Sequence, residues 1–252
     1  MFSPTYLNDV EYDMNMNFLY YLPAIGCPNL SKKLEILNHN LHHIHENIGT
    51  NFSIIVNCYS DSDEILIFLK QFKFLDNVFD HCKEGVLTEL WLTNPHNNVI
   101  KNFDYVLFIL DDVLIQELDI HELIEVKTEY NLTLISPKVI NATYSYMQSF
   151  TGLTLNNALE IYCLLLTPED FDLYASKNTV RNRWMWGVDM LFGHWKINTG
   201  VYHKHAVLHS LPSMSDFREA YKLGDEYVQQ YGFNSVDELE RSVQPIVKEI
   251  DI

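Results

Sequence analysis

The feature that most constrains the fold is an alternation of apolar runs and helical periodicity in the first half of the chain. The runs at 18–25, 52–59 and 104–110 have the length and apolar content of buried strands. Apolar residues recur at helical spacing between the first two runs, over 31–48, and a second helix is expected over 64–72. Strands that alternate with helices are typical of an α/β fold with a mostly parallel sheet flanked by helices.

Past residue 112 the pattern is less regular, but strands and helices continue. Ser31 is the expected N-cap of the first helix, and Pro168 opens a later helix whose first turn is acidic. The polar stretch 215–252 has a helical pattern, with Gly224 and Gly232 as expected breaks. The remaining predicted elements are a short strand near 77–79, helices at 84–92 and 119–130, and strands at 132–137, 158–167 and 200–209. We expect one domain over residues 1–252.

The charge balance limits the partners. The chain carries 34 acidic and 17 basic residues, a formal net charge of −17. Nucleic acid and anionic lipid are bound by clustered lysine and arginine, so neither is an expected partner. A phosphate ligand is compatible with such a chain if a metal ion supplies the positive charge.

The sequence also bears on the compartment. No stretch approaches the about 20 apolar residues of a membrane span, and the N-terminal residues lack the basic and apolar regions of a signal peptide. The four cysteines are widely spaced without a CxxC motif, which predicts buried free thiols in a reducing compartment. We therefore expect a cytoplasmic protein.

The third apolar run ends on two adjacent aspartates, Asp111 and Asp112. In open α/β sheets, ligands bind beyond the carboxyl ends of the strands. Adjacent carboxylates suit Mg²⁺ or Mn²⁺, which take one or two of them and fill their remaining positions with phosphate oxygens and water. A cap on the following turn explains the pair equally well, and the two residues alone do not decide between these roles.

Residues 183–209 contain a second group of candidates. Trp184, Trp186 and Trp195 lie close in sequence to Asp189. Aromatic walls with a carboxylate suit a sugar, whose apolar ring faces stack on tryptophan while its hydroxyls bond the carboxylate. Core packing explains the tryptophans equally well, and Asp189 is also placed to begin a helix.

Two sets of histidines are candidates for metal binding. His203, His205 and His209 alternate along a predicted strand and share one of its faces. We favour His209 because it closes the strand, where a ligand reaches a site at the sheet edge. The other set lies on the first helix, where we expect a solvated face rather than a zinc site; its members are His39, His42, His43 and His45.

Taken together, these segments resemble the glycosyltransferases of the GT-A fold, which use nucleotide-sugar donors. In that family a strand runs into a DxD-type motif, which here reads Leu110-Asp111-Asp112. A later W-G-x-D/E segment is present as Trp186-Gly187-Val188-Asp189, and a following strand ends on His209. The resemblance covers about residues 18–212. It implies a nucleotide-sugar half at about 18–115, an acceptor half at about 116–212 and a helical tail at 213–252.

The resemblance also implies roles for individual residues. Asp112 and His209 would hold Mn²⁺ or Mg²⁺, and Asp111 would assist through the ribose or a water because Leu110 replaces the first acidic residue of the motif. Asp189 would contact the acceptor or act as general base. The nucleotide-sugar would contact Pro23, Ala24, Ile25, Asp61, Lys83, Leu110 and Asp111, and the acceptor or sugar would contact Trp184, Trp186 and Gly187.

The implied function is metal-dependent transfer of a sugar from a nucleotide-sugar, most often a UDP-sugar in this family, to a glycan or another hydroxyl acceptor. Inversion and retention at the sugar carbon both remain open. One alternative is a sugar nucleotidyltransferase, although IGCPNLSKK at 25–33 is a poor match to its Gly-rich basic loop. The other is a non-catalytic carbohydrate-binding protein. Secretory members normally carry a membrane span, so the resemblance implies the cytoplasm of a bacterium or of a cell infected by a large virus.

Overall fold

The computed structural model describes residues 16–141, 149–211 and 217–252. In chain order the elements are β1 (Phe18–Ile25), α1 (Leu30–Ile48), β2 (Phe52–Cys58), α2 (Ser62–Leu69), β3 (Leu75–Cys82), α3 (Leu87–Leu92), the 3₁₀ helix η1 (Pro95–Asn102), β4 (Tyr105–Ile109), β5 (Val113–Glu117), α4 (Ile120–Glu129), β6 (Leu134–Ile140), β7 (Leu153–Asn156), β8 (Cys163–Leu166), α5 (Pro168–Lys177), the 3₁₀ helix η3 (Val188–Met190), β9 (Thr199–His209), α6 (Phe217–Gln229), α7 (Val236–Ser242) and β10 (Ile246–Ile250).

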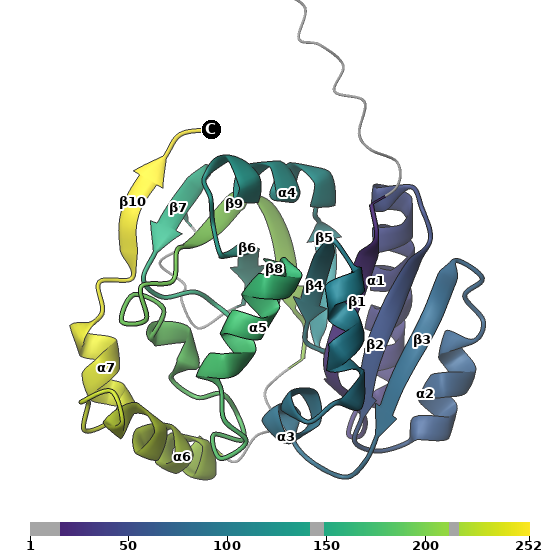
Figure 1. The fold of residues 1–252 in the computed structure, drawn as a ribbon, viewed down its shortest axis with the longest axis horizontal. Helices are drawn as coiled ribbons and strands as arrows, with labels where there is room; N and C mark the ends of the chain where they lie inside the picture. The colour runs from purple at the N-terminus through teal and green to yellow at the C-terminus, as the bar shows by residue number, and fades with distance from the viewer. Residues whose placement is uncertain (1–15, 142–148, 212–216) are drawn as a thin grey trace, which may run out of the picture.

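The strands of the described residues form a single ten-stranded sheet, in the order β10-β7-β9-β6-β8-β4-β1-β2-β3, with β5 paired to β9. The neighbours β4, β1, β2 and β3 are parallel, as the alternation of strands and helices predicts. The other half is mixed, because β5, β7, β8 and β10 each pair with antiparallel neighbours while β6 and β9 run parallel. Figure 1 shows the parallel half beside α1 and α2, and the mixed half beside α6 and α7.

Each face of the sheet is covered by helices, which explains the uninterrupted apolar strands. On β1, Tyr20 and Leu22 belong to a core shared with α1 and α4. Leu19 and Tyr21 point to the opposite face, into a core shared with α3, α5 and the C-terminal helices. A strand buried on both faces has no polar face to alternate with, so it reads as a continuous apolar run.

Helix α1 differs from the sequence expectation at its start and along one face. It begins at Leu30, so Asn29 is the N-cap residue and the predicted cap Ser31 lies within the first turn. The histidine face is not simply solvated. His39 Nε2 lies 2.8 Å from the carbonyl of Ile115 in β5, and His43 Nε2 lies 2.8 Å from the carbonyl of Leu118 just after it, which ties the helix to the sheet.

Three strands differ from the predicted elements in the middle of the chain, because β5 and β7 were not expected and β8 is shorter than the apolar stretch that contains it. Strand β5 was not expected, because its five residues are too few to show a periodicity of their own; it forms by pairing with β9. The apolar stretch 158–167 contains only the four-residue strand β8. Its earlier part is buried without pairing, because Ala158 and Leu159 pack in the core beside η3.

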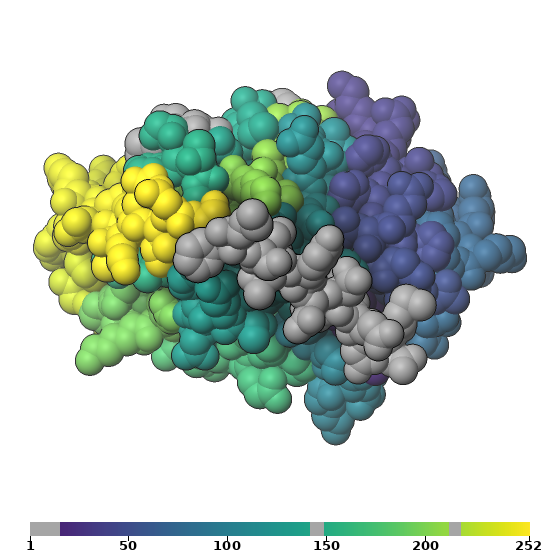
Figure 2. All heavy atoms as spheres, turned by 90° about the horizontal axis from the view of Figure 1, so that it is seen from above, coloured from purple at the N-terminus to yellow at the C-terminus, as the bar shows by residue number. Residues whose placement is uncertain are grey.

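The C-terminal stretch is not wholly helical, and one of its expected breaks is wrong. Helix α6 runs through Gly224, where a Cβ atom would lie 2.9 Å from the Trp186 side chain. The glycine is therefore required by close packing and does not end the helix. Gly232, with φ +90°, does follow the end of α6. The tail then forms β10, which pairs with β7 (Figure 1). Figure 2 shows these last residues, in yellow, packed beside the green and teal segments of the same domain.

The structure also bears on the expected burial of the cysteines and on the expected lack of a membrane span. All four cysteines are free, but Cys27 and Cys82 are exposed because they lie in the turn after β1 and at the end of the edge strand β3. Cys58 and Cys163 are buried as expected. Within the described ranges, no helix has the length and apolar content needed to cross a bilayer.

The contact between β10 and the loop before β7 predicts a substitution effect. In Gly152→Ala the new Cβ atom would lie 2.4 Å from the backbone oxygen of Ile250, so β10 must shift. We expect the free energy of unfolding to fall by about 1–3 kcal/mol, the usual cost of overpacking. Urea denaturation measures this loss, with Gly85→Ala as control because its Cβ atom would meet neighbours at 3.4 Å or more. Equal stability of the two variants would contradict the prediction.

Candidate active site

Two adjoining cavities lie at the carboxyl ends of the parallel strands, and Leu87 of α3 lines both. Figure 1 shows α3 at the lower edge of the sheet. The first cavity has a volume of about 330 Å³ and is lined by Ala24, Cys27, Pro28, Asn29, Lys33, Tyr59, Gly85, Val86, Leu87, Leu110, Asp111, Asp112, Trp184 and Leu211. The second has about 310 Å³ and is lined by Leu87, Leu110, Asp112, Glu160, Ile161, Tyr162, Trp184, Met185, Trp186, Gly187, Asp189, Met190, His209, Tyr221, Val236 and Glu240.

The residues shared by the two cavities mark the place where they meet. These are Leu87, Leu110, Asp112 and Trp184. Asp112 carries the only charge among them at neutral pH. A group bound to Asp112 therefore faces both cavities, which is the arrangement needed to join two ligands at one point.

Strand pairing brings Asp112 to His209. In the β5–β9 ladder Val113 is opposite His209, and the Ser210 amide donates to the Asp112 carbonyl over 2.8 Å. The Asp112 Oδ2 and His209 Nε2 atoms are 3.1 Å apart. The carboxylate raises the pKa of His209, chiefly through this hydrogen bond, so a proton held between the two groups is favoured. The pair thus attracts positive charge.

The Asp112–His209 pair fits a small divalent cation. Asp112 Oδ1 is buried and has no hydrogen-bond partner among the described residues, so one carboxylate oxygen remains to bind an ion. No cluster of three or more possible metal ligands occurs in the described part of the chain. Mg²⁺ and Mn²⁺ tolerate such a sparse protein set because water and phosphate oxygens complete their shell.

The other two candidate histidines lie elsewhere on β9. His203 Nε2 is 2.9 Å from Thr154 Oγ1, and His205 Nε2 is 2.7 Å from a carboxylate oxygen of Glu122 on α4. Neither lines either cavity. Among the three histidines, the geometry places only His209 beside the aspartate pair.

Asp111 is held by a lysine that sequence reasoning missed. Lys33 Nζ lies 2.7 Å from Asp111 Oδ2 and also donates to Tyr59 Oη and the Gly26 carbonyl. Burial raises the pKa of Asp111 to about 6; the Lys33 charge opposes this rise and the Asp112 charge adds to it. The sequence does contain a signal for its burial. Lys33 lies one helical turn before the buried Leu37, and so on the same face of α1.

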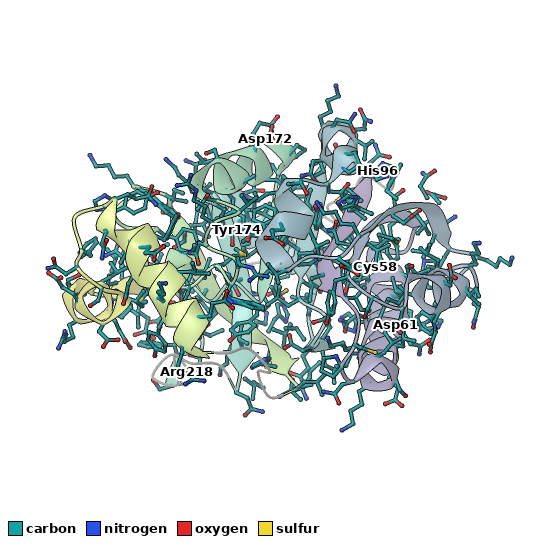
Figure 3. All side chains as sticks on the ribbon, turned by 90° about the horizontal axis from the view of Figure 1, so that it is seen from below. Cys58, Asp61, His96, Asp172, Tyr174 and Arg218 are labelled. Atoms are coloured by element: carbon teal, nitrogen blue, oxygen red, sulfur yellow. The ribbon has the colours of Figure 1, made fainter. Side chains whose placement is uncertain are left out.

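The residues proposed for the nucleotide-sugar are not all brought together. Ala24 and Leu110 line the first cavity with Asp111, whereas Pro23 and Ile25 flank Ala24 without lining it. Asp61 is exposed at the start of α2 (Figure 3), where it accepts a hydrogen bond from Ser60, and it lies outside the cavity. Lys83 is also exposed and outside it, with its ammonium 3.3 Å from Thr93 Oγ1.

The W-G-x-D segment lines the second cavity. Trp186 packs against Tyr221 of α6, with ring centroids 4.9 Å apart, and Gly187 turns the chain with φ +80°. Asp189 is half-buried in the short helix η3, so it both begins a helix and faces the cavity. Trp184 lines both cavities, and its buried indole nitrogen has no partner within the described residues.

Other residues of the site were not anticipated, and one candidate is structural. Trp195 packs on Phe192 and Tyr231 and lines neither cavity, so it belongs to the core. Several unexpected lining residues of the second cavity come from the segment before β8 and from the tail; they are Glu160, Ile161, Tyr162, Tyr221, Val236 and Glu240. No motif marks them, because they reach the cavity only through tertiary packing.

Comparisons with known proteins agree with this geometry at the level of the fold. No family model and no curated protein matches the sequence. A solved structure of S. aureus TarS 1–349 in complex with UDP-GlcNAc aligns with a TM-score of 0.54 at 14% identity, over 85% of this chain and 66% of that one. The complex of TarS 1–349 with UDP gives 0.54 at 16% identity, over 84% and 65%.

A further TarS structure aligns with a TM-score of 0.56 at 12% identity, over 85% of this chain and 39% of that one. The chain thus spans slightly less than two thirds of TarS 1–349. At these identities the alignment shows architecture, and it confirms the fold expected from the sequence motifs. The chain has the mixed α/β GT-A fold of TarS.

Proposed function

We propose that this protein is a metal-dependent glycosyltransferase that moves a sugar from a UDP-sugar to a hydroxyl group of a glycan acceptor. The observation that carries the proposal is the Asp112–His209 pair, with one carboxylate oxygen left without a partner among the described residues, at the junction of two cavities. The fold shared with TarS, which was solved with UDP and with UDP-GlcNAc, supports a nucleotide-sugar in the first cavity.

The two cavities divide the work of the reaction. In the first, Tyr59 and the turn at Cys27–Asn29 offer an aromatic and an uncharged wall for the nucleoside. Asp112 and His209 would hold Mn²⁺ or Mg²⁺, which supplies positive charge for the leaving diphosphate. Lys33 keeps Asp111 in place, where its carboxylate can accept a hydrogen bond from a ribose hydroxyl or from a water.

The second cavity would receive the acceptor. Asp189 faces it and is the residue we assign as general base in an inverting reaction, taking the proton from the attacking hydroxyl. In a retaining reaction the same carboxylate would orient the acceptor. Trp184, between the cavities, would contact the transferred sugar.

A binding measurement tests the proposal directly. We expect UDP to raise the melting temperature in the presence of Mn²⁺ but not with EDTA, since a ligand at 100 times its Kd stabilises a protein by about 2.7 kcal/mol. GDP serves as the nucleotide control. Equal stabilisation by UDP with and without metal would contradict the metal site.

Turnover separates an enzyme from a carbohydrate-binding protein of the same fold. We expect Mn²⁺-dependent hydrolysis of at least one member of a panel of UDP-sugars, measured as release of UDP, and less hydrolysis of GDP-sugars. Metal-dependent UDP binding without release of UDP from any donor, in the presence or absence of glycans, would support the non-catalytic alternative instead.

A further inference from the structure

The second cavity has a one-sided charge distribution. Its lining includes four carboxylates, Asp112, Glu160, Asp189 and Glu240, together with His209. The described lining contains no lysine or arginine. A cation at Asp112 and His209 would lie at one end of the cavity, and the rest of the described lining offers no lysine or arginine to an anionic group.

The tail supplies one wall of this cavity and an aromatic surface. Tyr221 on α6 and Glu240 on α7 both line it, although they lie beyond the segments that carry the sequence motifs. The Tyr221 ring, 43% exposed, meets Trp186 at an angle of 55° between the ring planes. Gly224 allows this approach, because a Cβ atom there would lie 2.9 Å from Trp186.

Aromatic rings beside carboxylates favour one chemical class of ligand. The apolar face of a pyranose ring packs on aromatic carbon, while its hydroxyls donate to carboxylate oxygens. A phosphate, sulfate or carboxylate group would instead meet Glu160, Asp189 and Glu240 without a basic residue to compensate it. Like charges in a partly buried site repel each other strongly, since the surrounding dielectric is low.

We propose that the second cavity binds an uncharged glycan, packed on Trp186 and Tyr221, and discriminates against acceptors that carry phosphate, sulfate or carboxylate groups. This inference rests on the proposed function for its use in transfer, since it names the acceptor class of the same site. Glu240 lies exposed on α7 at the cavity, so its charge can be reversed without burying a new charge.

The test compares matched acceptors. With the UDP-sugar that is hydrolysed fastest as donor, transfer is measured to methyl glycosides of neutral hexoses and to their 6-phosphates. We expect kcat/KM to be at least about tenfold higher for a neutral glycoside than for its 6-phosphate, a factor of ten corresponding to about 1.4 kcal/mol. Equal or better use of the phosphates would overturn the proposal.

Variants in the tail test the assigned residues. Glu240→Lys should reduce the preference for neutral over phosphorylated acceptors about tenfold, whereas Glu226→Lys, exposed on α6 outside the cavity, should keep the wild-type ratio. Tyr221→Ala should raise the acceptor KM, and Tyr221→Phe should restore it because the ring is kept. An unchanged ratio in Glu240→Lys, or an unchanged KM in Tyr221→Ala, would contradict the assignment.

Binding without a donor distinguishes this inference from the proposed function. Trp184 and Trp186 line the cavity, so glycan binding is followed by intrinsic fluorescence in the absence of any nucleotide. Binding of the neutral glycosides without any UDP binding or transfer would refute the transferase and retain the inference. Metal-dependent UDP binding together with failure of every neutral glycoside to bind would refute the inference and retain the donor site.

Discussion

Replacing Asp112 with alanine is expected to remove metal-dependent binding of UDP and to lower the rate of sugar transfer by at least about 10²–10³-fold, the usual cost of losing one electrostatic stabiliser of the transition state. Asp112 is the charged residue that faces both cavities. Without it, His209 alone would remain of the proposed pair, and the described residues contain no group of three or more metal ligands.

Two measurements check this expectation. The thermal shift caused by UDP and Mn²⁺ reports binding, and release of UDP from the donor reports turnover. Asp172→Ala is the matched control, because Asp172 is an exposed aspartate on α5 outside both cavities (Figure 3). Survival of both signals in Asp112→Ala would show that the proposed metal site is wrong.

Replacing Lys33 with methionine is expected to lower the free energy of unfolding by about 3–5 kcal/mol at neutral pH, the usual cost of removing one partner from a buried ion pair. Lys33 is 9% exposed, and its ammonium lies 2.7 Å from Asp111. The same ammonium donates to Tyr59 and Gly26, so the turn after β1 should also loosen. Urea denaturation measures the loss, with the exposed neighbour variant Lys32→Met as control.

The loss of unfolding free energy in Lys33→Met should depend on pH, because the charge of Asp111 does. Its pKa is about 6 in the folded chain and is raised from 3.8, mainly by burial, so folding favours the protonated form. The contribution of Asp111 to the free energy of unfolding is therefore fully present below pH 3.8, and it is lost as the pH rises through about 6. Removing the Lys33 charge raises the pKa of Asp111 further, because that charge opposes the effect of burial.

The destabilisation of Lys33→Met should consequently be larger at pH 8 than at pH 5, and the added substitution Asp111→Asn should recover much of it. The same loss at both pH values would show that Lys33 contributes through the packing of its aliphatic stem and not through the ion pair.

Sequence reasoning succeeded where a local pattern carries the information. The runs at 18–25, 52–59 and 104–110 are apolar throughout because the strands they form are covered on both faces. Asp111 and Asp112 lie at the end of the last of these runs, so their place at the sheet edge follows from the pattern. The W-G-x-D segment is likewise contiguous, and its Trp186, Gly187 and Asp189 line the same cavity.

It could not give positions that depend on a distant partner. Asp61 and Lys83 follow strands as the candidate residues should; in the structure they are exposed and bond Ser60 and Thr93, and their role in binding a nucleotide-sugar stays a prediction. The tail was expected to be helical throughout, but β10 forms because an unpaired edge of β7 is available to it. Backbone groups at a sheet edge gain hydrogen bonds from any compatible segment, which no local periodicity records.

The sequence by itself determined the α/β alternation, the aspartate pair at a strand end and the order of motifs that indicates the GT-A fold. Only the tertiary structure decided that His209 lies beside Asp112, that Lys33 neutralises Asp111, and that Tyr221 and Glu240 enter the second cavity. The physical reason is sequence separation. The β5–β9 register and the packing of α6 on Trp186 join segments far apart in the chain, and such contacts arise from the whole fold.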